Sequence, residues 1–190
     1  MTVTFRTLSL LFFTLISIGH TADKTQFAEV SIITPIQIHD THESIKGVRL
    51  GLLKSNNFNV TGLDLGFISH TEGNFSGLQL GGSNFTVGNS FGAQAAIFNI
   101  TKENHTGIQA GFANWTEGDF SGLQFGALNM NQENVRGLQA GLINYAYNPK
   151  GVQLGFVNYT AQMKGLQIGF LNFHGKAETF KFFPIVNMSF

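Results

Sequence analysis

The densest group of side chains that could bind a metal or transfer protons is His39-Asp40-Thr41-His42-Glu43. It holds two imidazoles and two carboxylates in five residues. The group lacks the HExxH spacing that places two histidines on one face of a helix. It also lies in a polar segment between an apolar stretch and the repeats described below. We interpret it as a solvated loop, and the alternative is a metal site.

Other reactive residue types are absent or isolated. Cysteine is absent, which excludes disulfides, thiolate catalysis and Cys-based zinc sites. His70, His105 and His174 fall in predicted turns or at repeat ends, with no acid at a fixed spacing. No GxSxG, P-loop or GxGxxG motif occurs in a suitable context. We therefore predict no catalytic, cofactor-binding or metal-binding residues and no cofactor, in a protein that is not an enzyme.

The composition excludes further classes of protein. Acidic and basic residues both total 11 of the 190, so no basic surface indicates nucleic acid. Charged residues make up 12% of the chain, against roughly 25% in an average soluble domain. Phe and Gly are abundant, at 20 and 23 residues. The chain is long enough for one domain with a core.

The first 22 residues have the pattern of a secretory signal peptide. Arg6 precedes an apolar run from Leu8 to Ile18, and small or polar residues follow up to Ala22. This run is too short to span a bilayer. The alternative is a buried hydrophobic N-terminal element. We expect export to the cell envelope, either to the outer membrane or cell surface, or to the periplasm.

A glycine-based repeat dominates the rest of the chain. Its first glycine recurs every 15 residues and, in the last two steps, every 14, at Gly47, Gly62, Gly77, Gly92, Gly107, Gly122, Gly137, Gly151 and Gly165. A second glycine follows four residues later in every copy except one, where Ala96 replaces it. Seven copies carry a Gln between the glycines and an Asn after them: Gln79, Gln94, Gln109, Gln124, Gln139, Gln153 and Gln167, with Asn84, Asn99, Asn114, Asn129, Asn144, Asn158 and Asn172.

The repeated phrase favours β-structure. Two interior glycines would each cost a helix about 1 kcal/mol relative to alanine. In a strand, alternation places Gly, Gln and Gly on one face and the aliphatic residues on the other. Polar turn formers separate the phrases at 70–76, 100–106, 115–121 and 147–150. The class is therefore an all-β repeat protein.

Two architectures can use this repeat. We predict a single-domain β-solenoid of about nine 15-residue units, because stacked coils bring each Gln and Asn onto its own copies, where side-chain amides form ladders. The alternative is an up-and-down antiparallel β-barrel of the outer membrane. The chain end FKFFPIVNMSF, with Phe190 last, resembles the C-terminal signature of such barrels. In a solenoid the same segment would be a closing cap, in which Pro184-Ile185-Val186-Asn187 repeats the second half of the unit.

A five-residue periodicity within each unit predicts which side chains face inward. The fourth residue of each unit is apolar: Leu50, Leu65, Leu80, Ala95, Ala110, Phe125, Ala140, Leu154 and Ile168. Five residues later come mostly large apolar or aromatic residues: Phe85, Ile100, Trp115, Met130, Tyr145, Tyr159 and Phe173. A third set comprises Val60, Phe75, Phe120 and Val135, although Ser90 and His105 interrupt it. We predict that these three sets fill the core of a three-sided coil.

The iterated phrase G-(L/V)-Q-(L/A/I)-G-(F/L)-x-N, following a signal peptide and closed by P-I-x-N, resembles a family of bacterial surface-repeat proteins of the cell envelope. The resemblance covers about residues 45–190. It implies an envelope location and brings no activity, ligand or site residue with it. The first two copies depart from the phrase, since Arg49 and Asp64 replace Gln while Lys54 and Ser69 replace Asn. We predict that these copies form an atypical terminal repeat.

These observations divide the chain into a signal peptide (1–22), an N-terminal strand and polar loop (23–46, with the strand at 27–38), nine β-repeats (47–173) and a closing strand (174–190). The function we predict is a non-enzymatic exported envelope or surface protein, acting as a structural or adhesion scaffold. The alternative is an integral outer-membrane barrel acting as a small pore or anchor. The partner is unknown; envelope components or glycans are candidates, outer-membrane association is possible, and nucleic acid is not expected. Trp115, Tyr145 and Tyr159 would either stack on sugars or belong to the core.

Overall fold

The computed structural model describes residues 24–177 and 181–189. The predicted signal peptide and Phe190 lie outside the described residues. No helix long and apolar enough to cross a membrane occurs in the described part of the chain.

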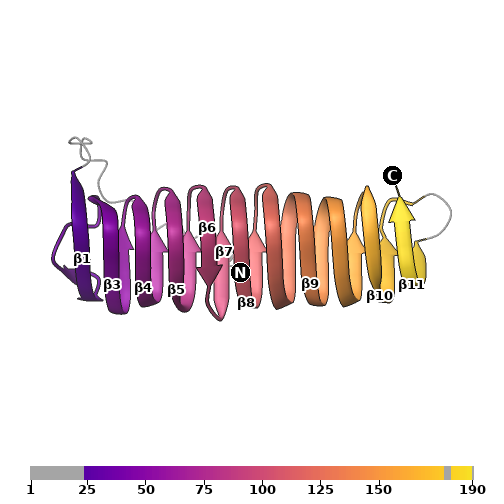
Figure 1. The fold of residues 1–190 in the computed structure, drawn as a ribbon, viewed down its shortest axis with the longest axis horizontal. Helices are drawn as coiled ribbons and strands as arrows, with labels where there is room; N and C mark the ends of the chain where they lie inside the picture. Colours follow the sequence, from indigo (N-terminus) through magenta and orange to yellow (C-terminus); the bar gives the residue numbers. More distant parts are fainter. Residues whose placement is uncertain (1–23, 178–180, 190) are drawn as a thin grey trace, which may run out of the picture.

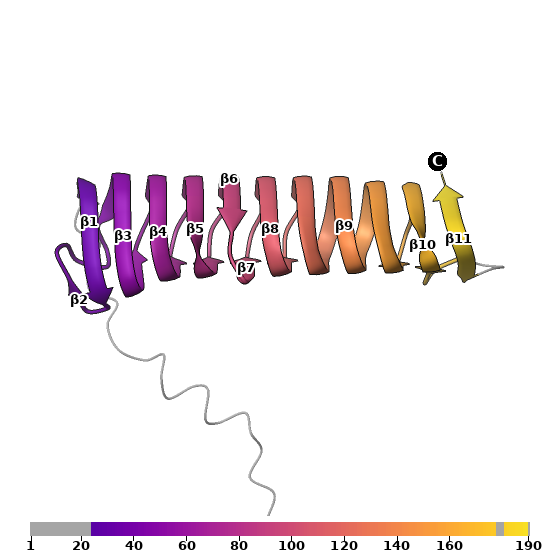
Figure 2. The same cartoon turned by 60° about the horizontal axis from the view of Figure 1, so that its bottom comes forward.

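The described chain is a β-solenoid, as predicted, in which the coils stack along one axis (Figures 1 and 2). Its strands are β1 (Thr25–Ile33), β2 (Ile36–Gln37), β3 (Ser44–Asn57), β4 (Val60–Thr71), β5 (Phe75–Thr86), β6 (Ser90–Ala95), β7 (Phe98–Thr101), β8 (His105–Thr116), β9 (Phe120–Thr160), β10 (Gly165–His174) and β11 (Phe182–Ser189). Neighbouring coils run parallel, with each repeat glycine beside the same glycine of the next coil. The alternative of an antiparallel barrel is therefore wrong.

The first glycine of the repeat lies directly against the backbone of the preceding coil. Gly122 has a φ of 140°, in a region that L side chains rarely adopt. A Cβ built on it would collide with the carbonyl oxygen of Gly107 in the preceding coil. The same clash recurs at most of the first glycines from Gly62 onward. Glycine recurs here because no side chain fits between stacked backbones.

The interior of the coil is largely polar. Four columns of side chains point inward, and we name them the Gln, Asn, Thr and apolar columns. The Gln and Asn columns are the repeat residues named above, all 0–1% exposed. The Thr column consists of Asn57, Thr71, Thr86, Thr101, Thr116, Asn131, Ala146 and Thr160. The apolar column consists of Ile45, Val60, Phe75, Ser90, His105, Phe120, Val135, Pro149 and Met163.

Two of the three predicted core sets are wrong. Residues in the set from Leu50 to Ile168 point outward, and Leu50 itself is 42% exposed. The set from Phe85 to Phe173 also points outward, and Tyr159 is 37% exposed. Only the third set, with Val60, Phe75, Phe120 and Val135, is buried. Gln and the aliphatic residues do lie on opposite faces of the strand, as predicted, but Gln occupies the inner face.

The Gln column is one continuous hydrogen-bond ladder. Each side-chain amide donates to the side-chain oxygen of the preceding copy, with N···O distances of 2.7–3.0 Å from Gln94 to Gln167. Thr101 and Thr116 add donors to the same oxygens. A buried amide costs little when its donor and its acceptor are both satisfied. The ladder therefore makes a polar interior stable.

The Asn column is a second ladder, and its hydrogen bonds run in the opposite direction. Asn84 donates to Asn99, and each copy donates to the next as far as Asn172, at 2.8–2.9 Å. The same amides also donate to backbone carbonyls of the next coil, as Asn99 does to Ala110. Both ladders require adjacent coils to be in exact register, so they specify the stacking.

The atypical first copies terminate the Gln ladder. Gln79 donates to the Asp64 carboxylate at 2.7 Å, and Asp64 in turn accepts two hydrogen bonds from Arg49, at 2.9 and 2.7 Å. Both charged side chains are fully buried. The guanidinium also donates to the His70 carbonyl and to the Thr71 hydroxyl. A carboxylate accepts only, so it completes a ladder whose donors all point toward it.

The first copy also differs in register from the prediction. Lys54 pairs with Ile68 and points outward, whereas Ser55 pairs with Ser69 in the Asn column. A bulge between Gly51 and Lys54 shifts the chain by one residue. The assignment of Lys54 to the Asn position was therefore wrong. The segment 147–150, predicted as a turn, is extended within β9.

The two ends of the solenoid are closed differently. At the N-terminal end, β1 pairs in parallel with β3, and β2 folds back on β1, so 27–38 is a hairpin rather than one strand. At the C-terminal end, β11 pairs antiparallel with β10. Asn187 lies opposite Gln167 and donates to its side-chain oxygen at 2.8 Å. The closing segment thus extends the Gln ladder, and it does not repeat the Asn half of the unit.

Breaking the Gln ladder is expected to destabilise the protein although the replacement is apolar. Gln109→Met leaves the amide of Gln124 without its acceptor. We expect the free energy of unfolding to fall by about 3 kcal/mol, the cost of unsatisfied buried polar groups. Chemical denaturation measures the change. Gln132→Met, at an exposed position, is the control and should change it by less than about 0.5 kcal/mol; equal effects would contradict the ladder.

A double-mutant cycle tests the buried ion pair between Arg49 and Asp64 at the end of the Gln ladder. Asp64→Gln leaves Arg49 buried without its carboxylate, and Arg49→Gln leaves Asp64 without its cation. Each single substitution should cost about 3–5 kcal/mol. The double variant extends the amide ladder by two units, so it should be more stable than either single variant. A double variant as unstable as the sum of the singles would contradict this account.

Candidate functional site

The outer surface carries most of the apolar side chains. The first apolar face consists of the residues on either side of buried Asp64 and of each buried Gln, from Leu63 and Leu65 to Leu166 and Ile168. The second apolar face consists of the residues on either side of buried Ser69 and of each buried Asn of the Asn column, from Ile68 and His70 to Leu171 and Phe173. These faces are outward because the Gln and Asn ladders occupy the inner side of the same strands.

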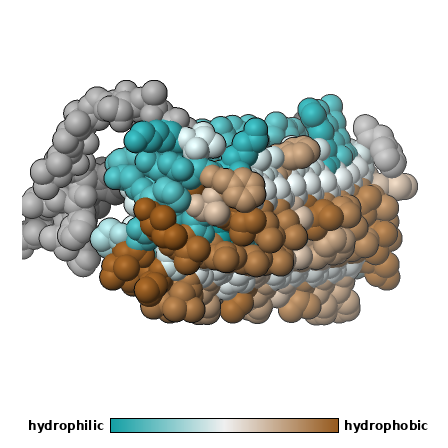
Figure 3. All heavy atoms as spheres, turned by 60° about the vertical axis from the view of Figure 1, so that its left-hand side comes forward, coloured by the Kyte–Doolittle hydropathy of each residue, from teal (hydrophilic) through white to brown (hydrophobic). Residues whose placement is uncertain are grey.

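The two faces meet at a ridge, which we define as the residue after the second glycine. Its large side chains are among the most exposed in the molecule, at 54–65%. They are Phe67, Ile97, Phe112, Leu142, Phe156 and Phe170. Such an extensive exposed apolar surface typically marks an interaction site in a soluble protein. Figure 3 shows brown hydrophobic bands, separated by pale strips, below a hydrophilic upper edge.

Between Leu63 and Phe173, the charged side chains of the surface are confined to the remaining side, the polar edge. Between Leu63 and Phe173 the only charged residue elsewhere is Asp64, which is buried. The charged residues of the polar edge are Glu72, Lys102, Glu103, Glu117, Asp119, Glu133, Arg136, Lys150 and Lys164. Both signs are present, and Lys102 forms an ion pair with Glu117 of the next coil. The edge therefore has no strong net charge.

A further column of Asn residues, missed in the sequence, holds the turns of the polar edge. The side-chain oxygens of Asn59, Asn74, Asn89 and Asn104 accept hydrogen bonds from the backbone N–H of the next copy, at 2.8–3.3 Å. Asp119 continues the column to Asn134. The 15-residue spacing of these Asn residues was the available signal. Their role is to link turns, because their oxygens are already occupied.

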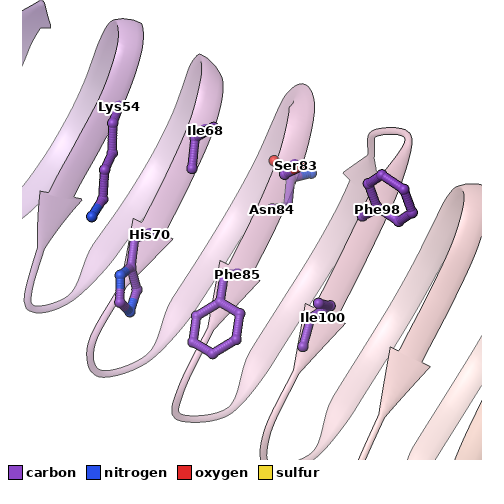
Figure 4. A pocket seen from close by; sticks show the side chains of 8 residues that line it. All are labelled: Lys54, Ile68, His70, Ser83, Asn84, Phe85, Phe98 and Ile100. Atoms are coloured by element: carbon purple, nitrogen blue, oxygen red, sulfur yellow. The ribbon is translucent and has the colours of Figure 1, made fainter. Parts of the chain in front are cut away.

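A shallow groove crosses the second apolar face near its N-terminal end (Figure 4). Its volume is about 500 Å³, and its wall is mostly apolar. The lining residues are Lys54, Ile68, His70, Ser83, Asn84, Phe85, Phe98 and Ile100. Burial, followed by the nearby Lys54 ammonium, lowers the pKa of His70. Its ring meets Phe85 edge-on, with centroids 4.9 Å apart. The groove could accept an apolar group but has no pair of groups arranged for catalysis.

The predicted loop His39-Asp40-Thr41-His42-Glu43 does not converge on a point. His39 pairs with the buried Glu29 at 3.0 Å, Asp40 accepts from the backbone of His42, and Glu43 accepts from Gln26. Among residues 24–177 and 181–189, no three His, Asp or Glu side chains are grouped so that they could hold a metal ion.

Trp115, Tyr145 and Tyr159 lie in one outward row of the second face, so their assignment to the core was wrong. Trp115 and Tyr145 also border a second shallow hollow with Met130. The rings of Tyr145 and Tyr159 stack on each other, with centroids 5.4 Å apart and planes 6° apart. Their flat faces are therefore turned toward neighbouring coils rather than outward. This arrangement is poorly suited to stacking on a sugar.

His105 is the one titratable group in the apolar column, contrary to its predicted place in a turn. It is 0% exposed and stacks on Phe120, with centroids 5.4 Å apart. Burial lowers the pKa of His105 to about 4. The imidazole is therefore neutral at pH 7 and serves as a packing residue.

The protein is expected to lose stability on acidification through His105. Its pKa in the folded state is about 4, below the usual 6.5 of the unfolded state, so the unfolded state binds more protons between these values. The free energy of unfolding should be constant above pH 6.5 and fall by about 3 kcal/mol toward pH 4.

His105→Phe should abolish that part of the fall, since Phe already occupies this column at Phe75 and Phe120. Denaturation curves of both proteins across this pH range provide the measurement. Parallel pH profiles would show that His105 is not the titrating group.

The chain matches no protein-family model, no curated protein and no solved structure. The resemblance to bacterial surface-repeat proteins therefore stays a prediction.

Proposed function

We propose that this protein is a non-enzymatic, exported scaffold of the cell envelope that associates with its partner through the two apolar faces and their ridge. The observation that carries the proposal is the distribution of side chains. Polar amides fill the interior in hydrogen-bonded ladders, while most Phe, Leu and Ile side chains lie outside. Exposed apolar surface on this scale is costly in water unless something covers it.

The described residues favour binding over catalysis. Catalysis needs unlike groups converging on one point, whereas the repeat places like residues in rows along the solenoid. The side-chain amides of the Gln and Asn columns bond to their own copies. The outer surface is thus where a partner would bind, and its long, regular form suits a scaffold. The signal-like residues 1–22 and the resemblance to envelope repeat proteins support an envelope location.

Glycan binding receives less support than apolar association. Sugar stacking would require exposed aromatic faces, and the candidate rings of Tyr145 and Tyr159 cover one another. Phe156 and Phe170 on the ridge also stack on each other, with centroids 5.1 Å apart. The ridge side chains nevertheless expose more than half of their surface, as with Phe112 at 56%.

Envelope association is expected to depend on the ridge. The triple variant Phe112→Ser, Phe156→Ser and Phe170→Ser leaves both inner ladders intact, so it should fold with unchanged ladder contacts. We expect at least a tenfold loss of the full-length protein from the sedimented envelope fraction of expressing cells, measured by immunoblot.

The control variant Lys102→Ser, Glu103→Ser and Glu117→Ser alters the polar edge at the same number of positions, and its distribution should match the wild type. Unchanged association of the ridge variant, with circular dichroism confirming its fold, would overturn the proposed function.

A further inference from the structure

We infer that the two apolar faces insert into the surface of a phospholipid bilayer, with the solenoid axis parallel to the membrane and the polar edge in water. The inference rests on the proposed function and names its partner as lipid. About 10 stacked coils at about 4.8 Å each give a rod of about 48 Å, long enough to contact many lipids. Amphipathic helices at membrane surfaces bury their apolar side about 5–10 Å into the boundary between headgroups and acyl chains, and we infer the same mode of insertion for this rod.

The charge distribution matches this orientation. Between Leu63 and Phe173 neither apolar face nor the ridge carries a charged side chain. A charge placed in hydrocarbon is costly, so lipid-facing surfaces are depleted of charge over their whole length. Lys54 is the one charged residue on these faces, and it lies near the N-terminal end. The uncharged surface is therefore continuous over most coils.

The border between the first apolar face and the polar edge carries a row of cations. Arg136, Lys150 and Lys164 each precede the first glycine of consecutive coils and are exposed. The glycines that follow them are stacked on one another, which aligns the three side chains. Long basic side chains at such a border extend their charged ends toward lipid phosphates while their stems cover apolar surface.

The border between the second apolar face and the polar edge carries amphipathic aromatic residues. Trp115, Tyr145 and Tyr159 occupy its outermost row, and Tyr147 lies two residues farther toward the edge. These are the single Trp and all three Tyr residues of the chain. Trp and Tyr concentrate at membrane–water interfaces because their rings are apolar and their N–H or O–H groups are polar. Both borders thus carry residue types typical of a bilayer interface.

The shape of the ridge favours lipid over a second copy of the chain. A dimer formed through one flat face would leave the other apolar face in water. The ridge is also irregular, because Gly82 and Ala127 interrupt the large side chains. A protein partner needs a surface complementary in shape to pack against this uneven ridge, whereas fluid acyl chains adapt to its shape.

Flotation with vesicles of dioleoylphosphatidylcholine tests the inference. Full-length wild-type protein should float with the vesicles, and the ridge variant Phe112→Ser, Phe156→Ser and Phe170→Ser should partition at least tenfold less. Because both proteins carry the same residues 1–22, the difference reports the ridge and not the N-terminal segment. The variant Lys102→Ser, Glu103→Ser and Glu117→Ser should float as the wild type does.

Tryptophan quenching by brominated lipids tests the orientation. Trp115 should be quenched more by bromines near the lipid carbonyls than by bromines near the chain ends. In the variant Phe112→Trp with Trp115→Phe, the single Trp moves to the ridge, and the preference should reverse. The same quenching preference at both positions would overturn the orientation.

The outcomes separate this inference from the proposed function. A wild-type protein that does not float, but forms dimers that the ridge substitutions dissociate in analytical ultracentrifugation, would make a second copy the occupant. That result would overturn the lipid inference and leave the proposed function standing. Ridge substitutions that leave envelope association unchanged would overturn the proposed function itself, whatever the vesicles show.

Discussion

The hydrogen bond between a side-chain amide and its own copy in the next coil is the interaction on which the rest of the structure depends. An amide has a donor group and an acceptor oxygen, so a stack of identical residues satisfies every interior member, as at Gln109 between Gln94 and Gln124. Such a stack forms only if successive coils are parallel and in register. Glycine is then needed where the backbones of adjacent coils meet. The two ends of the Gln ladder need unlike residues, which are Asp64 with Arg49 at one end and Asn187 at the other.

This constraint reverses the usual distribution of side chains. The ladders fill the narrow interior, and strand alternation then directs the residues flanking Gln and Asn outward. Stability rests on polar contacts inside together with the short apolar column around Phe75 and Phe120. The outer apolar residues contribute little to specifying the coil, so they are available for association. The fold and the proposed function therefore use different sets of residues.

The strict period predicted the solenoid, with a barrel as the alternative, and the stacking of Gln and Asn, because a period reports directly on which residues are neighbours. It also marked the copies with Arg49 and Asp64 as an atypical terminal repeat, although it did not predict their buried ion pair. It did not reveal which side of the strand faces inward. The alternation of side chains around Leu50 or Gln79 is the same whichever face of the strand points inward. The rule that apolar residues are buried therefore predicted the wrong inner face. Two further features depend on backbone geometry that the repeat pattern does not show. A bulge places Ser55 instead of Lys54 in the Asn column, and antiparallel pairing places Asn187 on the Gln ladder.

The central claim is that the glutamine amides are locked in a buried ladder, and side-chain hydrogen exchange measured by NMR tests it most directly. The side-chain NH₂ groups of Gln94, Gln109, Gln124 and Gln139 should exchange orders of magnitude more slowly than those of Gln132 and Gln162, which are exposed in the same molecule. Exchange of the ladder glutamines as fast as that of Gln132 and Gln162, under conditions where backbone amides are protected, would contradict the account.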